Sequence, residues 1–223
     1  MSNGFDIESK DPTDWQELWV TGETPWHQLQ VEDALKTHFA GWAPARILVP
    51  LCGKTLDLKW LAEQRHEVVG ADLSEVALER FLTEHGLVAM KRREGDFNVY
   101  RADNITLYQG DFFGLTPAQV GRFDAVYDRA ALVALPPPLR PAYVAKVKEL
   151  LKTQVSRPFQ ILQLTFERNP PDGQGPPFAI CESDLSEVYG ADFVIEKMET
   201  RKLREPPGAN VRVIYRMQRR FGR

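Results

Sequence analysis

Apolar residues recur along the chain in two patterns, one typical of strands and the other typical of helices. From residue 46 onward, short apolar runs alternate with segments in which apolar residues return every three or four positions. The apolar runs predict strands over residues 46–51, 66–72, 123–128, 159–166, 193–200 and 211–217, and a hairpin over 96–108. The segments between them predict helices over 56–64, 74–86, 139–151 and 182–190.

The residues before the first strand predict two helices. Trp15 and Trp19 lie four positions apart and share one helical face, with Asp11 or Thr13 as the cap. The stretch from Gly22 to Pro25 ends that helix, and a second helix follows over 31–39. Further along, we expect Ser74 and Ser183 to cap two helices, Gly86 to close one, and Leu56, Trp60 and Leu61 to point inward.

Strands that alternate with helices indicate a mostly parallel sheet covered on both faces, and the last two strands have little between them. We therefore predict an α/β fold of the Rossmann-like class. It would have a seven-stranded, mostly parallel sheet, an antiparallel edge strand and an N-terminal helical cover. No repeat or linker divides the chain, so we expect one domain over 1–223, with the cover over 1–40 and the core over 41–223.

Composition excludes several classes of protein. The net charge of the 223 residues is only −3, which does not favour nucleic acid or an anionic membrane as a partner. The polar N-terminus and the lack of a long apolar run predict no membrane segment. Two cysteines are too few for a disulfide framework, so we expect a cytoplasmic protein. We also expect it to be a monomer. The four histidines are scattered without metal spacing, so no metal site is predicted.

Unusual residues follow the predicted strands. Ligands of open parallel sheets bind beyond the carboxyl ends of the strands. Leu51-Cys52-Gly53 follows the first strand, Asp72 ends the second, Asp111-Phe112 follows the hairpin, and Asp128-Arg129 ends the fourth. A carboxylate such as Asp72 can accept both hydroxyls of an adenosine ribose. We therefore expect one cleft lined by these four segments.

Each of these residues also has a purely structural interpretation. Asp72 could simply cap the helix that starts near Ser74, and Asp128 and Arg129 could form an ion pair. Trp15 and Trp19 could belong to the core. Cys52 has no histidine in a recognised arrangement beside it, which favours a small buried thiol over a nucleophile.

Four segments together resemble the thiopurine S-methyltransferase family in order and spacing. They are WQELWVTGETPWHQ (15–28), VPLCGKTLDLKWLAEQRHEVVGADLSE (49–75), FDAVYDRAALVALPPPLRPAYV (123–144) and GPPF (175–178). The resemblance implies a class I methyltransferase fold and S-adenosylmethionine as the methyl donor. It also implies a sulfur acceptor, with selenium or tellurium species in bacterial members, and so a role in tellurite or selenium detoxification.

By position, the resemblance assigns the donor to a set of residues at the strand ends and in the cover: Trp15, Trp19, Leu51, Asp72, Asp111, Phe112 and Arg129. Trp26 falls where the family has an aromatic side chain over the acceptor. The ribose acid is often Glu in animal members, whereas here it is Asp. The C-terminal third matches less well, so the acceptor-side arginine is either Arg201 or Arg204.

These features predict an enzyme that methylates the sulfur of a thiopurine or another aromatic thiol by in-line displacement. We expect Arg129, with Arg201 or Arg204, to favour the thiolate electrostatically, without a dedicated base. A halide or small-thiol methyltransferase on the same fold, or a non-catalytic interaction protein, remains the alternative. A dehydrogenase would need a GxGxxG turn, which the sequence lacks.

Overall fold

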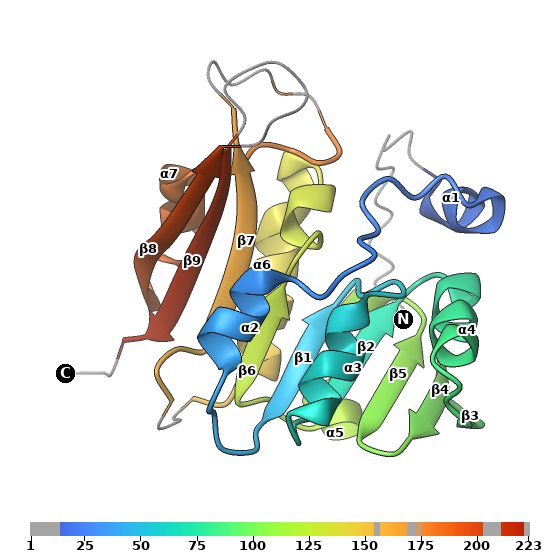
Figure 1. Ribbon diagram of the computed structural model, residues 1–223. Helices are drawn as coiled ribbons and strands as arrows, with labels where there is room; N and C mark the ends of the chain where they lie inside the picture. Colours follow the sequence, from blue (N-terminus) through green and yellow to red (C-terminus); the bar gives the residue numbers. More distant parts are fainter. Residues whose placement is uncertain (1–13, 154–156, 169–172, 174, 203–210, 221–223) are drawn as a thin grey trace, which may run out of the picture.

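The computed structural model describes residues 14–153, 157–168, 173, 175–202 and 211–220 (Figure 1). The strands in chain order are β1 (Arg46–Pro50), β2 (Glu67–Asp72), β3 (Met90–Glu94), β4 (Phe97–Ala102), β5 (Ile105–Gln109), β6 (Ala125–Asp128), β7 (Ile161–Glu167), β8 (Phe193–Lys202) and β9 (Val211–Arg219). They form one sheet in the order β3-β4-β5-β2-β1-β6-β7-β9-β8. The five central strands from β5 to β7 are parallel, and an antiparallel pair flanks them on each side.

The predicted Rossmann-like fold is confirmed, with nine strands rather than seven among the described residues. The hairpin of β3 and β4 extends the sheet beyond β5. The sequence did not indicate β3 because its residues, MKRRE, are mostly charged and exposed and show no apolar alternation. On the other side, antiparallel β9 lies inside the sheet and β8 forms the edge.

The helices are α1 (Trp15–Thr21), α2 (Asp33–Phe39), α3 (Leu56–Glu63), α4 (Glu75–Glu84), α5 (Pro117–Val120), α6 (Arg140–Leu150) and α7 (Glu182–Tyr189), with short 3-10 turns η1 (Phe112–Gly114), η2 (Leu132–Ala134) and η3 (Pro137–Leu139). Asp14 caps α1, whereas the predicted caps, Asp11 and Thr13, lie outside the described residues. Ser74 caps α4 as predicted. Cys181, not Ser183, holds the N-cap position of α7.

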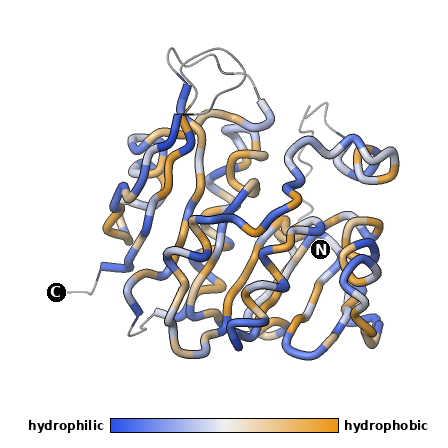
Figure 2. The backbone as a smooth tube through the Cα atoms, viewed as in Figure 1, coloured by the Kyte–Doolittle hydropathy of each residue, from blue (hydrophilic) through white to orange (hydrophobic). Residues whose placement is uncertain are grey.

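Two apolar clusters cover the two faces of the sheet. On one face pack α2, α3 and α4, through residues such as Leu35, Leu61 and Phe81. On the other face pack α6 and α7, through residues such as Tyr143 and Tyr189. Figure 2 shows the hydrophobic residues concentrated along the central strands. Within α3, Leu58 and Leu61 are buried, whereas Leu56 and Trp60, which we also expected to point inward, are only partly buried.

The register of the parallel strands aligns their carboxyl ends. Pro50 pairs with Ala71 and Asp72 pairs with Gln109, so the residues that follow these positions emerge at the same edge of the sheet. Asp128, paired with Gln163, ends β6 on the other side of β1. Helix α1 lies over this edge, above α4 in Figure 1. The loops that follow β1, β2, β5 and β6 are therefore neighbours at this edge of the sheet.

Among the described residues, no helix is long and apolar enough to cross a membrane. The proposed boundary between the cover and the core, and the cytoplasmic location, stay predictions.

Candidate methyl-donor and acceptor site

A cavity of about 760 Å³ opens at the carboxyl ends of the parallel strands. Its lining contains all the residues predicted for the donor, together with the aromatic residue predicted for the acceptor: Trp15, Trp19, Trp26, Leu51, Asp72, Asp111, Phe112 and Arg129. These residues come from α1, from the loop after it, and from the ends of four strands. The sheet topology thus brings together residues that are more than a hundred positions apart in sequence.

The turn after β1 forms part of the cavity wall. Leu51 and Gly53 both have positive φ angles, +46° and +50°, which bend the chain sharply after the strand. Trp19 of α1 packs directly against the turn, and a Cβ atom on Gly53 would lie 2.5 Å from Cζ2 of that indole. The absence of a side chain at Gly53 therefore allows the cover helix to approach the turn.

Asp72 is a buried carboxylate held by the backbone. Its Oδ2 accepts the N–H of Gly53 at 2.7 Å, and its Oδ1 accepts the N–H of Ser74 at 2.8 Å. Burial raises the pKa of Asp72 to about 6, although both hydrogen bonds oppose the shift. The carboxylate also lines the cavity, so the structural and the ligand-binding interpretations coexist. Each oxygen has remaining lone pairs that can accept a ligand hydroxyl.

Asp111 and Phe112 form the part of the wall that follows β5. The Asp111 side chain is exposed, and its Oδ1 accepts the N–H of Phe113 at 3.0 Å. Phe112 is buried and packs against Tyr143, with 5.3 Å between the ring centroids. This fixed aromatic ring beside a carboxylate can bind a flat heterocycle that carries a hydrogen-bond donor.

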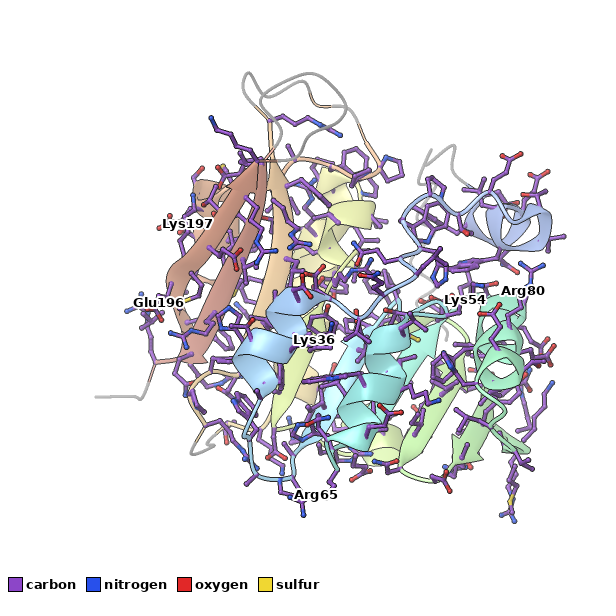
Figure 3. The ribbon with its side chains drawn as sticks, in the orientation of Figure 1. Lys36, Lys54, Arg65, Arg80, Glu196 and Lys197 are labelled. Atoms are coloured by element: carbon purple, nitrogen blue, oxygen red, sulfur yellow. The ribbon has the colours of Figure 1, made fainter. Side chains whose placement is uncertain are left out.

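Three tryptophans form the aromatic side of the cavity. The ring of Trp26 lies 5.0 Å from that of Trp15 and 5.8 Å from that of Trp19, in both cases edge to face. Trp19 is buried and Trp15 is partly buried. Arg80 on α4 anchors this cover, because its guanidinium donates to the carbonyl oxygens of Trp19 at 2.6 Å and Val20 at 3.3 Å. Figure 3 shows Arg80 just below α1.

Arg129 extends from the end of β6 into the cavity. Its Nη2 donates to the carbonyl oxygen of Trp26 at 3.2 Å and its Nη1 to the Thr55 hydroxyl at 3.4 Å. Its guanidinium lies 4.0 Å from the Glu32 carboxylate and 3.8 Å from that of Asp57. These contacts hold the arginine in the cavity and connect it to the loop of Trp26.

Asp128 does not pair with Arg129. Its carboxylate is wholly buried and accepts the hydroxyl of Tyr143 at 2.7 Å and the N–H of Leu132 at 3.1 Å. Burial raises the pKa of Asp128. The two neighbouring charged residues therefore differ in role. Asp128 holds the loop after β6 through its hydrogen bonds, whereas Arg129 lines the cavity.

Sequence reasoning missed three charged residues next to Arg129. Glu32, which precedes α2, and Arg212, on β9, both line the cavity and form an ion pair at 2.7 Å. Asp57 accepts the Tyr127 hydroxyl at 2.9 Å and the N–H of Glu32 at 2.9 Å. Glu32, at the N-cap of α2, and Asp57, in the first turn of α3, are buried charges with 3% and 1% exposure. No motif connects these positions, and only the fold brings them together.

The structure does not bring Arg201 into the cavity. Arg201 is exposed on β8, where it contacts Glu199 and lies 3.9 Å from Asp33. Arg204 lies outside the described residues. Among the described C-terminal arginines, Arg212 is the one that lines the cavity.

Two further side chains complete the site. Cys52 is buried, as expected, and burial raises the pKa of its thiol well above the usual value. His27 lines the cavity beside Trp19, with 6.5 Å between the rings. Burial and the positive charge of Lys54 lower the pKa of His27. Among the described residues, no group of three or more His, Cys, Asp or Glu side chains could hold a metal ion.

A solved structure with the same fold carries S-adenosylhomocysteine. It is the 1,6-didemethyltoxoflavin-N1-methyltransferase of Burkholderia thailandensis, with 1,6-didemethyltoxoflavin also bound. The TM-score is 0.62 at 19% sequence identity, over 91% of this chain and 84% of the other. This likeness shows the fold of a class I methyltransferase.

Comparison with related sequences identifies the family, which the structural likeness alone does not. A thiopurine S-methyltransferase of Pseudomonas fluorescens (strain Pf0-1) is 40% identical over 191 residues, which cover 84% of this chain and 86% of the relative. A thiopurine S-methyltransferase of Pseudomonas syringae pv. tomato is 41% identical over 187 residues, covering 82% and 83%. The sequence profile of the family described as Thiopurine S-methyltransferase matches residues 10–221. The chain therefore belongs to the thiopurine S-methyltransferase family of S-adenosylmethionine-dependent methyltransferases.

Proposed function

We propose that this methyltransferase acts on the sulfur of thiopurines and related aromatic thiols. The observation that carries the proposal is a largely enclosed guanidinium, that of Arg129, which lines the same cavity as the indole of Trp26 and donates to the backbone carbonyl oxygen of that residue. An aromatic wall binds a flat ring, and a guanidinium favours the ionised form of a neighbouring acid. Selenium and tellurium species are soft nucleophiles of the same kind and belong to the same proposal.

The residues at the strand ends fit S-adenosylmethionine. Asp72 offers a buried carboxylate to the ribose hydroxyls, and Phe112 with Asp111 offers a ring and an acceptor to the adenine. The indoles of Trp15, Trp19 and Trp26 present aromatic surface to a sulfonium cation. These roles are assigned from the lining of the cavity and from the chemistry of each side chain.

Approximation and exclusion of water account for the reaction. The bound donor supplies a methyl group on a positively charged sulfur. A thiolate that attacks it loses its charge, so the reaction is favoured where the tryptophans keep water out. Arg129 holds the acceptor sulfur in its anionic form, and the thiol gives its proton to bulk water before the displacement.

The proposal is tested with isotopically labelled donor and a panel of acceptors: thiopurines, simple aromatic thiols, small aliphatic thiols, halide, selenite and tellurite. Labelled methyl on aromatic thiols supports it, whereas exclusive labelling of halide or aliphatic thiols refutes it. For two aromatic thiols of different acidity, the rate should rise with pH at the ionisation of each thiol. An acidic limb at one fixed pH for both would identify an enzyme base, for which His27 is the candidate.

Arg129→Ala should reduce kcat/KM for an aromatic thiol by about tenfold to a hundredfold, because a charge-assisted contact contributes about 1.5–3 kcal/mol. Steady-state kinetics near neutral pH measure this effect. Arg101→Ala is the matched control, because Arg101 is exposed on β4 and pairs with Glu94. Equal losses in both variants, with circular dichroism unchanged, would remove Arg129 from the proposed role.

A further inference from the structure

A buried carboxylate that does not line the cavity lies close to Arg129. It belongs to Asp57, in the first turn of α3, which is 1% exposed. Its Oδ1 atom accepts the N–H of Glu32 at 2.9 Å, and its Oδ2 atom accepts the hydroxyl of Tyr127 at 2.9 Å. The same Oδ2 atom lies 3.8 Å from Nη1 of Arg129. One side chain of α3 therefore contacts the start of α2, the strand β6 and the residue that follows β6.

The loop between α1 and α2 is held at two points by this group. Arg129 donates to the carbonyl oxygen of Trp26 at 3.2 Å, and Asp57 accepts the N–H of Glu32 six positions further along. Asp57 and Arg129 also lie close to each other. The place of Trp26 relative to the guanidinium therefore depends on all three contacts. An acceptor that binds between this indole and this guanidinium meets a geometry that Asp57 helps to fix.

A purely structural junction between α3 and β6 would not require a charge. Burying a carboxylate costs free energy, and an apolar side chain of similar size could join these elements without that cost. The positive charge of Arg129 compensates the negative charge of Asp57. Burial and the Asp57 carboxylate raise the pKa of Tyr127 well above its usual value, so its hydroxyl stays protonated and remains a donor. The buried charge is thus explained by the arginine that it faces.

Arg129 keeps hydrogen-bond donors for a ligand in this arrangement. A guanidinium has five N–H groups, and the hydrogen bonds to Trp26 and Thr55 use two of them. At 3.8 Å, Asp57 is too far away for a hydrogen bond, so it orients the guanidinium through charge without occupying a donor. The two side chains are 12% and 1% exposed, so solvent screens their attraction weakly. The remaining N–H groups stay available to an anion in the cavity.

We infer that Asp57 is a positioning residue for the methyl transfer. It acts through Arg129, by holding the guanidinium and the loop of residues 26–32 in the arrangement that receives the acceptor. The inference rests on the proposed function, which assigns Arg129 to the acceptor sulfur. Asp57 itself touches no ligand and exchanges no proton in the reaction.

A double-mutant cycle separates positioning through Arg129 from a general structural role. The variants are Asp57→Asn, Arg129→Ala and the two combined, and the measurement is kcat/KM for an aromatic thiol. Asp57→Asn removes the charge with almost no change in size and should reduce kcat/KM by about tenfold. In the Arg129→Ala background the same change should reduce it by less than about twofold, because the arginine that Asp57 positions is gone. A structural defect would reduce both backgrounds equally.

Asp124→Asn is the matched control. Asp124 also accepts a backbone N–H, that of Arg46 at 2.8 Å, and pairs with a cation, Lys152 at 2.8 Å, but it lies before β6 and does not line the cavity. Its kcat/KM should equal that of the wild type. Hydrogen exchange of the amides of residues 27–31, in the ligand-free protein, should become faster in Asp57→Asn and stay unchanged in Asp124→Asn.

A wild-type kcat/KM in a folded Asp57→Asn variant would overturn the inference. So would equal losses in the two backgrounds, or unchanged exchange in residues 27–31. If Asp57→Asn does not fold, Tyr127→Phe enters the same cycle. It removes one hydrogen bond from Asp57 and should reduce kcat/KM by about threefold only where Arg129 is present, and equal losses would again overturn the inference. The proposed function fails separately, if the acceptor panel yields no methylated aromatic thiol, and the exchange of residues 27–31 then still tests Asp57.

Discussion

At the scale of single residues, the pKa of Asp72 is subject to two opposing effects. Burial disfavours its charged form and raises its pKa to about 6, whereas the N–H groups of Gly53 and Ser74 favour the carboxylate. In the ligand-free protein this raised pKa favours folding below the usual value of 3.8, and the benefit is lost as pH rises through about 6. A ligand whose hydroxyls donate hydrogen bonds to the carboxylate favours the ionised form of Asp72 instead.

Affinity for S-adenosylhomocysteine should therefore depend on the ionisation of Asp72. Ribose hydroxyls bind the ionised carboxylate, so affinity should be nearly full above about pH 7, about halved near pH 6 and about tenfold weaker near pH 5. Calorimetric titration across this range measures the slope. Asp72→Asn should bind more weakly at neutral pH and show no such slope. A flat wild-type profile, or the same slope in the Asn variant, would contradict the assignment of Asp72 to the ribose.

Gly53→Ala should destabilise the protein more than a glycine substitution usually does. The residue has φ +50°, and the added Cβ would lie 2.5 Å from the Trp19 ring. Gly41→Ala is a matched control, because Gly41 has φ +75° but nothing within 4 Å of the added atom. Urea unfolding should show an extra loss of about 1–3 kcal/mol in the Gly53 variant. Equal losses would mean that Trp19 moves aside freely.

The sequence identified part of the site because the relevant residues follow strands directly. Leu51, Asp72, Asp111 and Arg129 each come after an apolar run, and parallel strands present such positions at one edge. Glu32 and Arg212 carry no such signal. Their roles arise from packing between β9 and the start of α2, which no local pattern encodes.

At the scale of elements, α1 depends on a few contacts with the rest of the protein. Its seven residues are too few to form a stable helix alone. Asp14 caps its start, and Arg80 holds the carbonyl oxygens at its end, where a positive charge also favours the helix dipole. We expect this cover to become more ordered when donor and acceptor bind.

Arg80→Ala should loosen α1 selectively. The loss of contacts with two carbonyl oxygens should favour opening by about 1 kcal/mol, which is roughly a fivefold change in the opening equilibrium. Hydrogen exchange of the amides in Trp15–Thr21 measures it, with and without S-adenosylhomocysteine. Arg92→Ala, an exposed arginine of β3, should leave these amides unchanged. Unchanged protection of α1 in Arg80→Ala would show that other contacts hold the cover.

The elements differ in how clearly the sequence predicts them. The central strands are buried on both faces, so they stand out as continuous apolar runs. Strand β3 escapes prediction because it packs against one neighbour and exposes its side chains. Its pairing with β4, through Lys91 opposite Tyr100 for example, follows from the short turn between them rather than from its composition.

At the scale of the whole molecule, the cavity spans segments from both ends of the chain, from Trp15 to Arg212. A ligand that binds there holds the cover, four strand ends and β9 together. S-adenosylhomocysteine at a hundred times its Kd should stabilise the fold by about 2.7 kcal/mol, which raises Tm by roughly 5–10 °C for a chain of this size. Thermal unfolding followed by circular dichroism measures the shift. A wild-type Tm that the ligand leaves unchanged would contradict binding at this cavity. So would a rise in Tm that is equally large in Asp72→Asn.

The two outermost strands of the sheet have a consequence for behaviour in concentrated solution. Strand β3 exposes Lys91, Arg92 and Arg93, and β8 carries Glu196, Lys197, Glu199, Arg201 and Lys202 with an irregularity after Lys197. An uncovered strand is a template on which another chain can pair and start aggregation. Two copies that met along β3 would bring like charges together, and the irregular β8 offers an uneven hydrogen-bonding edge. Within the described part of the chain, the sheet can therefore end in a strand without an outer partner at each side, β3 and β8, and its charges still oppose the addition of strands from other molecules.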